Sequence, residues 1–306
     1  MTAAVTTRLT ITLAARQRVL FAVLCFVWGT TWLAMKVGIA AVPPGLFAGT
    51  RWTTAGLMLL LWRWARGQRL QIPMRLTGRL LVNALLMVSL NQVIQLYGLR
   101  FISAGLAAVL SSALTPIALL GFAVLMGQER FAWRQLAAIS LGVAGVLVLF
   151  TPAAVAGRLD IRELLGAVAV IIATLAYSAG SVMSRPLMHS LAPAQMAATT
   201  NLTGGAILLI ASIAFEPGAA TALIHAWGWR AAAAWLYLLL PGSILSTVIY
   251  FLLVRDWGAS RTGTYAFVSP VIAVVVGATL FDERLPAEDL AGMALMLGAA
   301  GLVLRR

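Results

Sequence analysis

The sequence predicts an all-α, polytopic membrane protein with ten transmembrane helices, built as two inverted five-helix repeats around a central cavity. Three observations predict this fold: the composition, the length of the apolar runs and an internal repeat. Of the 306 residues, 61% are hydrophobic and 10% are charged, whereas a soluble domain has about 25% charged residues. The chain is therefore expected to be integral to a lipid bilayer.

The apolar runs are long enough to cross a bilayer. A helical span needs about 20 mostly apolar residues, because lipid offers the backbone no other hydrogen-bond partners. Such runs fall at 18–41, 44–64, 78–98, 102–126, 132–151, 163–184, 195–215, 231–253, 262–281 and 287–304. The first run is longer than the apolar core of a signal peptide and is interpreted as a span, preceded by a cytoplasmic segment at 1–17.

The second half of the chain repeats the pattern of the first. Three features recur 154 positions apart: Pro116 and Pro270, Leu136 and Leu290, and the pairs Glu129-Arg130 and Glu283-Arg284. Residues 28–36 align with 177–185 at an offset of 149, and an insertion near 216–225 explains the difference. A repeat of this size indicates a duplicated structural unit. We expect a first repeat at 18–151, a linker at 152–162 and a second repeat at 163–306.

The odd number of spans in each repeat sets the orientation of the second one. With five spans, the second repeat enters the membrane in the opposite direction, as in many secondary transporters. If the N-terminus is cytoplasmic, the cytoplasmic segments hold 15 of the 22 Lys and Arg residues and the outer segments hold six. Positive charge gathers on the cytoplasmic side of membrane proteins. The sequence therefore predicts an inner (plasma) membrane protein with both termini in the cytoplasm.

The net positive charge of the chain is also explained by the basic loops that orient it in the membrane. A formal net charge of +13 would suggest a nucleic-acid partner in a soluble protein, but here the basic residues lie mainly in loops between spans. We expect no nucleic-acid partner. An enzyme is not indicated either, since the sequence lacks an HExxH motif and both His189 and His225 fall in loops.

Several short motifs resemble a known transporter family. The residues are Trp28-Gly29-Thr30-Thr31-Trp32 with Lys36, Pro43-Pro44 and Arg51; the run 103–108; Thr115-Pro116 and Glu129-Arg130; and, in the second half, Gly258-Ala259-Ser260-Arg261, Pro270 and Glu283-Arg284. Their order resembles the ten-span EamA branch of the drug/metabolite transporter superfamily. The resemblance implies an inner-membrane exporter or importer of small metabolites, often amino acids, that works by alternating access. No cofactor is expected.

The candidate substrate site lies near the middle of the membrane, where the repeats meet. In the first span, Trp28, Thr31, Trp32 and Met35 share one helical face, and Tyr177 and Ser181 take equivalent places in the second repeat. Other predicted substrate contacts are Met87, Asn91 and Gln95 in the third span, Ser243, Thr247 and Tyr250 in the eighth, and Ser112 and Tyr265. The alternative is helix packing, hydrogen bonding between helices and an interfacial aromatic belt.

Two prolines are candidate hinges. Pro116 and Pro270 lie inside matching spans, and proline disrupts the hydrogen bond to the carbonyl four residues earlier, here those of Ser112 and Ala266. Two basic residues, Lys36 and Arg51, are candidates for contact with a substrate carboxylate. The alternative is that their charged ends reach the lipid headgroups.

All nine acidic residues lie in loops or at span ends. A proton-coupled exporter of cationic drugs needs a carboxylate within the membrane, so neutral, zwitterionic or weakly anionic solutes with an apolar part fit better. The leading hypothesis is export of neutral or aromatic amino acids or similar solutes. The alternatives are a transporter of phosphorylated sugars or nucleotide sugars, and a non-transporting membrane assembly partner. Glycines of the fifth and tenth spans suggest a homodimer face: Gly142, Gly145, Gly298 and Gly301.

Overall fold

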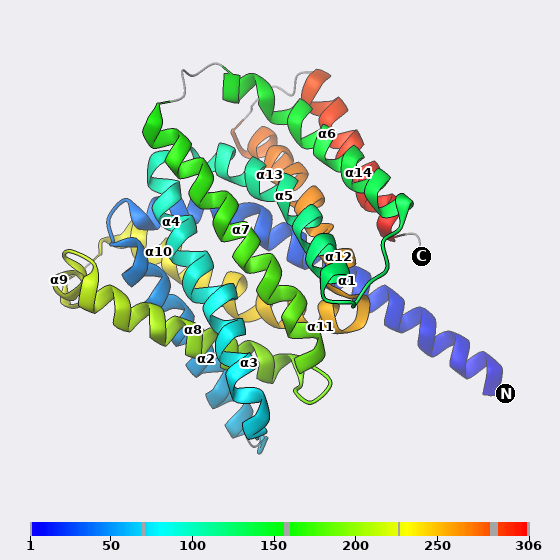
Figure 1. The fold of residues 1–306 in the computed structure, drawn as a ribbon, viewed down its shortest axis with the longest axis horizontal. Coiled ribbons are helices and arrows are strands. Elements are labelled where there is room, and N and C mark those ends of the chain that lie inside the picture. Colours follow the sequence, from blue (N-terminus) through cyan, green and yellow to red (C-terminus); the bar gives the residue numbers. More distant parts are fainter. Residues whose placement is uncertain (1, 69–70, 156–159, 226, 282–286, 305–306) are drawn as a thin grey trace.

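The computed structural model describes residues 2–68, 71–155, 160–225, 227–281 and 287–304, so Glu283 and Arg284 lie outside the described residues. Regular structure in the described ranges is entirely helical (Figure 1). The elements are α1 (Thr2–Ile39), α2 (Pro44–Ala65), α3 (Met74–Ala84), η1 (Leu85–Leu90), α4 (Asn91–Phe101), α5 (Ala104–Leu125), α6 (Trp133–Val155), α7 (Ile161–Leu187), α8 (Pro193–Phe215), α9 (Ala219–Ile224), α10 (Trp229–Tyr237), η2 (Leu238–Leu245), α11 (Ser246–Trp257), α12 (Ala259–Thr262), α13 (Tyr265–Phe281) and α14 (Ala287–Leu304).

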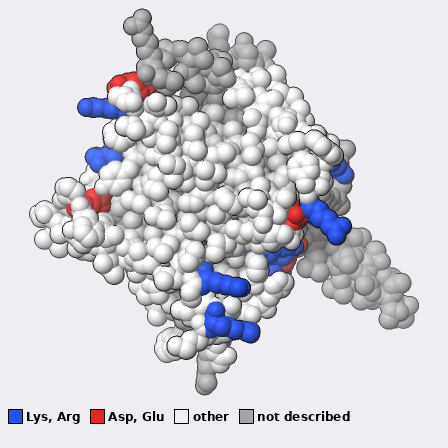
Figure 2. All heavy atoms as spheres, in the orientation of Figure 1, with Lys and Arg blue, Asp and Glu red and all other residues white. Residues whose placement is uncertain are grey.

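Six helical segments of the described chain are long and apolar enough to cross a membrane. They are Ala15–Ile39, Met74–Phe101, Ala104–Leu125, Ile161–Leu187, Pro193–Phe215 and Trp229–Trp257. The other expected spans correspond to α2, α6, α13 and α14, which are also helical. Figure 2 shows a face whose broad middle carries no charged side chain. An uncharged band of this kind is what lipid-facing helices require.

Two of these segments contain a π-helical stretch at the same place in each half of the chain. The π-helix η1 joins α3 to α4, and η2 joins α10 to α11. In a π-helix the hydrogen bonds run between residues five apart, and such stretches occur frequently at functional sites. The stretch η2 contains Pro241, whereas η1 contains no proline. Met87 lies within η1.

Glycines bring helices from the two halves into close contact. A Cβ atom added to Gly56 of α2 would lie 2.3 Å from the backbone nitrogen of Leu202 in α8. A Cβ atom added to Gly205 of α8 would lie 2.3 Å from the backbone nitrogen of Thr53 in α2. Leu202 is the repeat equivalent of Thr53, so the same contact occurs twice with the halves exchanged. The two helices meet backbone to backbone because neither position carries a side chain.

Other contacts between helices also occur twice, with the two halves of the chain exchanged. The helix α1 packs against α13, and its equivalent α7 packs against α5. Likewise α2 contacts η2, and its equivalent α8 contacts η1. The last helices of the halves, α6 and α14, lie side by side (Figure 1). Each half therefore buries its helices largely against the other half, and the polar groups described next lie where they meet.

Two of the glycines predicted to form a dimer face instead make contacts between helices of the same chain. Gly142 lies against the ring of Phe267, and Gly145 lies against Met296. Both glycines are buried, because α6 packs on α14 and α13. Gly298 is exposed and Gly301 is half-buried, so a homodimer through the tenth span stays a prediction.

Candidate functional site

A cavity of about 140 Å³ lies between the two halves. Helices from both halves line it: α1, α2, η1, α4 and α5 from the first, and α7, α8, η2, α11 and α13 from the second. Many lining residues are repeat equivalents of one another, such as Trp28 and Tyr177, or Thr115 and Ser269. The cavity is thus formed by matching backbone positions that carry different side chains.

Most of the predicted contact residues meet at this cavity. The lining includes Trp28, Thr31, Trp32, Met35, Met87, Asn91, Gln95, Ser112, Tyr177, Thr247, Tyr250 and Tyr265. Two predicted residues stand behind it. The Ser181 hydroxyl shares a hydrogen bond with the hydroxyl of Tyr250, and the Ser243 hydroxyl accepts one from Arg51. The structure therefore brings the predicted set together, and substrate contact stays a prediction for each member.

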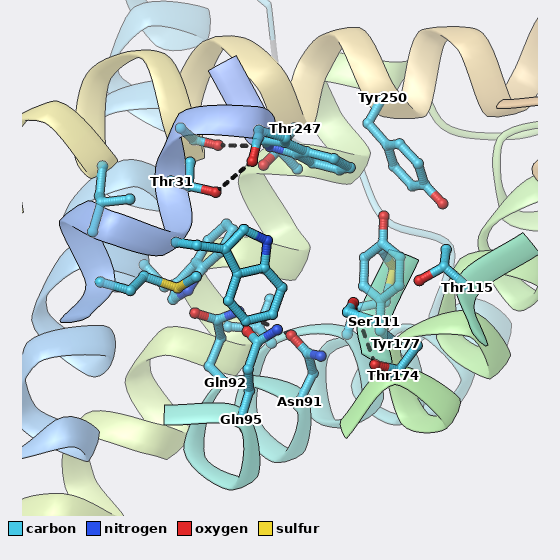
Figure 3. Close-up of a pocket in the computed structure, with 18 of the residues that line it drawn as sticks. Thr31, Asn91, Gln92, Gln95, Ser111, Thr115, Thr174, Tyr177, Thr247 and Tyr250 are labelled. Carbon is cyan, nitrogen blue, oxygen red and sulfur yellow. Dashed lines mark hydrogen bonds between the residues drawn. The ribbon is translucent and has the colours of Figure 1, made fainter. Parts of the chain in front are cut away.

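One part of the cavity wall carries three amide side chains. Asn91, Gln92 and Gln95 lie next to one another on α4 (Figure 3). The amide of Gln92 donates to Asn91 Oδ1 at 2.9 Å and to Gln95 Oε1 at 3.4 Å. Asn91 Nδ2 in turn donates to the carbonyl of Ala173 in α7 at 3.0 Å. This chain of hydrogen bonds orients the three amides.

Arg51 joins this amide group from α2. Its side chain is 3% exposed and donates to Gln92 Oε1 and to Ser243 Oγ, both at 2.7 Å. The guanidinium also lies over the ring of Trp52, 4.7 Å from the ring centroid. Among the described residues that line the cavity, Arg51 is the one ionisable residue other than tyrosine. It therefore brings a positive charge to an otherwise neutral wall.

The ring of Trp28 is surrounded by three tyrosines, which we call the aromatic box. The ring centroid of Trp28 lies 4.6 Å from that of Tyr265, 5.1 Å from Tyr250 and 6.3 Å from Tyr177. The hydroxyl ends of Tyr177 and Tyr250 point toward one another (Figure 3). Aromatic rings offer apolar area with fixed geometry. The box can hold an apolar or aromatic group of a solute.

The two prolines lie beside the cavity without breaking their helices. Pro116 is inside α5 and Pro270 is inside α13. The residues four positions earlier, Ser112 and Ala266, both line the cavity. A hinge role for the prolines stays a prediction.

Lys36 does not line the cavity. Its ammonium group donates to the carbonyls of Leu99 and Ile102, the second at 2.8 Å, where α4 ends. The last carbonyls of a helix lack partners within it and attract positive charge. Lys36 therefore caps α4, and of the two basic candidates only Arg51 is placed to meet a solute.

We expect Lys36→Met to lower the free energy of unfolding by about 1 to 3 kcal/mol, because hydrogen bonds from a charged group to two carbonyls are lost. Its transport selectivity should not change. Thermal unfolding in detergent and transport in vesicles measure the two effects. Arg79→Met is the control, because Arg79 is exposed. Equal unfolding temperatures for the two variants would contradict the capping role.

Sequence reasoning missed several lining residues. Thr200 and Asn201 line the cavity from α8, and they are the equivalents of Arg51 and Trp52 at the offset of 149. Ser269 is the equivalent of Thr115 at the offset of 154. Applying the offset of 149 to the candidate Arg51 would have found Thr200, whereas Trp52 and Thr115 were not candidates for substrate contact. Ser111 is the equivalent of the candidate Tyr265 at the offset of 154 and could have been found in the same way. Thr174 donates a hydrogen bond to Ser111 at 3.4 Å, but it is the equivalent of Cys25 and has no such signal.

Some polar residues of the spans have packing roles. Asn83 donates to the carbonyl of Gly180 at 2.6 Å and accepts from Thr200 at 3.1 Å, and it does not line the cavity. His189 and His225 are both exposed, as expected for loop residues.

Comparison with known proteins agrees with this architecture. The EamA-like transporter family matches residues 18–151 and 164–305. The chain belongs to the EamA-like transporter family. This confirms the resemblance seen in the sequence motifs, and it makes the chain a multi-pass membrane protein of a transporter family.

Relatives in the EamA-like transporter family cover nearly the whole chain. The inner membrane transporter YedA of Escherichia coli K12, described as uncharacterized, is 31% identical over 284 residues, which is 92% of this chain and 88% of YedA. The uncharacterized transporter YvbV of Bacillus subtilis is 27% identical and covers 94% of this chain and 91% of its own. A solved crystal structure with 19% identity superposes with a TM-score of 0.77 over 95% of this chain and 96% of that one. The last match supports the fold alone.

Proposed function

We propose that this EamA-like protein is a secondary transporter that exports neutral or aromatic amino acids, or similar amphipathic solutes, across the inner membrane. The observation that carries the proposal is the cavity between the halves. One part of its wall offers amides and a guanidinium, and another part offers the aromatic box. A solute with a polar head and an apolar side chain matches both parts.

The mechanism that we propose is alternating access by ten spans in two inverted repeats. Exchanged contacts support this arrangement: Gly56 with Leu202, and Gly205 with Thr53. In transporters with such repeats, one repeat rocks against the other around a site near the middle of the membrane. The π-helices η1 and η2 contact α8 and α2 at this boundary. Both termini would lie in the cytoplasm, from the distribution of Lys and Arg.

The transported solute is expected to move without a proton on a membrane carboxylate. None of the described residues that line the cavity is Asp, Glu or His. Carboxylates and histidines are the groups that carry protons in coupled transporters. Phosphorylated sugars fit less well, since multiply charged phosphate groups favour several basic partners and the described lining supplies Arg51 alone.

Counterflow in proteoliposomes tests this function. The purified protein is reconstituted with an unlabelled amino acid inside, and uptake of labelled amino acids is followed with and without a proton gradient. Uptake of a neutral or aromatic amino acid that ignores the gradient is the expected result. Uptake of phosphorylated solutes alone would overturn the amino-acid proposal.

Gln95→Ala should reduce the rate of transport about threefold to tenfold without loss of membrane insertion, because one amide contact to the solute is lost, worth about 1 kcal/mol. Initial rates of counterflow measure the effect. The matched control is Gln68→Ala, which removes the same amide from an exposed position. Wild-type transport by Gln95→Ala would contradict the proposal that α4 contacts the solute.

A further inference from the structure

We propose that Arg51 is the anion subsite of the cavity and that a carboxylate is the group a substrate must carry, whereas an α-amino group is dispensable. The inference rests on the proposed transport function and narrows its substrate class. The class is monocarboxylates with an apolar or aromatic chain, and amino acids are members of it because of their carboxylate.

Arg51 is a buried charge that no carboxylate of the described residues neutralises. Arginine stays protonated in proteins, and the side chain of Arg51 is 3% exposed. It contacts the neutral side chains of Ser243, Gln92 and Trp52. No carboxylate of the described residues pairs with it. A buried charge without a counter-ion is costly, and such charges within a membrane mark functional sites.

The guanidinium of Arg51 has more donors than hydrogen bonds. A guanidinium has five N–H donors and no acceptor. The two hydrogen bonds to Ser243 and Gln92 use one donor on each terminal nitrogen, and Nε has no partner although it is buried. The planar fork of arginine matches a carboxylate with two parallel hydrogen bonds. The guanidinium therefore keeps donor capacity that the protein itself does not use.

The charge balance of the cavity favours a solute with one negative charge. Since Arg51 is the one residue with a formal charge in the described lining, a solute with a single negative charge neutralises the site. The ammonium group of an amino acid finds no carboxylate there, only neutral oxygens and ring faces. Since it also has the same sign of charge as Arg51, the amino group contributes less to recognition than the carboxylate does. A phosphate dianion would exceed the single positive charge.

The aromatic box provides a place for the rest of the solute. The aromatic box opens on the same cavity as Arg51, and its tyrosine and tryptophan rings bury apolar groups well. A chain attached to the carboxylate can occupy the box while the carboxylate meets the guanidinium. Thus Arg51 decides the class of head group, and the box decides the class of side chain.

Three probes that differ in one group each test the inference: phenylalanine, 3-phenylpropionate, which lacks the amino group, and phenylalaninamide, which lacks the carboxylate. Binding is measured because 3-phenylpropionic acid crosses bilayers unaided. A ligand that binds the folded protein raises its unfolding temperature, and at a fixed ligand concentration the rise grows with the logarithm of the affinity. We expect both carboxylates to stabilise the detergent-solubilised protein and the amide to bind about tenfold to hundredfold more weakly, the range for a charged hydrogen bond.

Variants assign the effect to Arg51. We expect the affinities of Arg51→Gln for phenylalanine and for phenylalaninamide to lie within about twofold of each other. Arg51→Lys should still bind phenylalanine more tightly than phenylalaninamide, but by a smaller factor than the wild type, since the ammonium lacks the planar fork. Without ligand, Arg51→Gln should unfold at or above the wild-type temperature, because an uncompensated charge is removed. Arg79→Gln is the control at an exposed position.

The results distinguish a failure of the carboxylate inference from a failure of the proposed transport function. Equal binding of all three probes by the wild type, or binding of none, overturns the carboxylate inference, and so does an unchanged preference in Arg51→Gln. Should Arg51→Gln fail to fold, the wild-type comparison and Arg51→Lys decide. Carboxylate binding without counterflow of any solute would support the subsite and contradict the transport proposal.

Discussion

Replacing Trp28 by alanine is expected to lower transport to below about one tenth of the wild-type rate. The ring of Trp28 is the centre of the aromatic box and contacts Tyr177, Tyr250 and Tyr265. Each aromatic pair contributes about 0.5 to 1.5 kcal/mol beyond its buried area, and a loss of about 1.4 kcal/mol in binding the transition state is a tenfold loss of rate. The tyrosines would also lose the ring that sets their spacing.

Initial rates of counterflow, corrected for the amount of protein inserted, measure this effect. Trp28→Phe keeps an aromatic ring and should retain more transport than Trp28→Ala. The control Trp64→Ala removes the same side chain from a position that is 78% exposed. Wild-type transport by Trp28→Ala would remove the aromatic box from the proposed site and leave the amide group and Arg51 to account for binding.

Gly205→Ala should lower the free energy of unfolding by more than about 2 kcal/mol, although alanine is the better helix former. The added methyl group would lie 2.3 Å from the backbone nitrogen of Thr53, and a backbone cannot rotate away as a side chain can. The helices α2 and α8 must then separate. Since they carry Arg51 and Asn201 into the cavity wall, transport should fall as well.

Thermal unfolding in detergent measures the stability change, and counterflow measures the loss of transport. Gly121→Ala is a matched control: it lies in α5, it is exposed, and an added Cβ would meet nothing within 4 Å. This control should be neutral or stabilising by up to about 1 kcal/mol. Gly205→Ala and Gly121→Ala with the same unfolding temperature would contradict the close contact of α2 with α8.

Most of the candidate site could be predicted because its signals are local. Trp28, Thr31, Trp32 and Met35 share a helical face, which any helix of this sequence must present together. The offset of the repeat connects Trp28 to Tyr177, and both rings line the cavity. A site built from matching places in two repeats is therefore visible in one sequence.

What could not be predicted depends on partners distant in the chain. Lys36 and Arg51 look alike in the sequence, as single basic residues near the ends of spans. The fold places Lys36 on the carbonyls that end α4 and buries Arg51 beside Gln92 and Ser243. Which of two cations meets a solute depends on distances between helices, and periodicity along one helix carries no information about them.

The sequence by itself determined the helical class, the family and the duplication, because apolar length, composition and motif order are properties of the chain. Only the tertiary structure decided which polar residues face the cavity and which hold helices together, as with Asn91 and Asn83. It also introduced the π-helix at Met87, where no proline announces it. The physical reason is that a buried polar group must find its partner, and for Asn83 and Asn91 that partner is a backbone carbonyl of α7 in the other half.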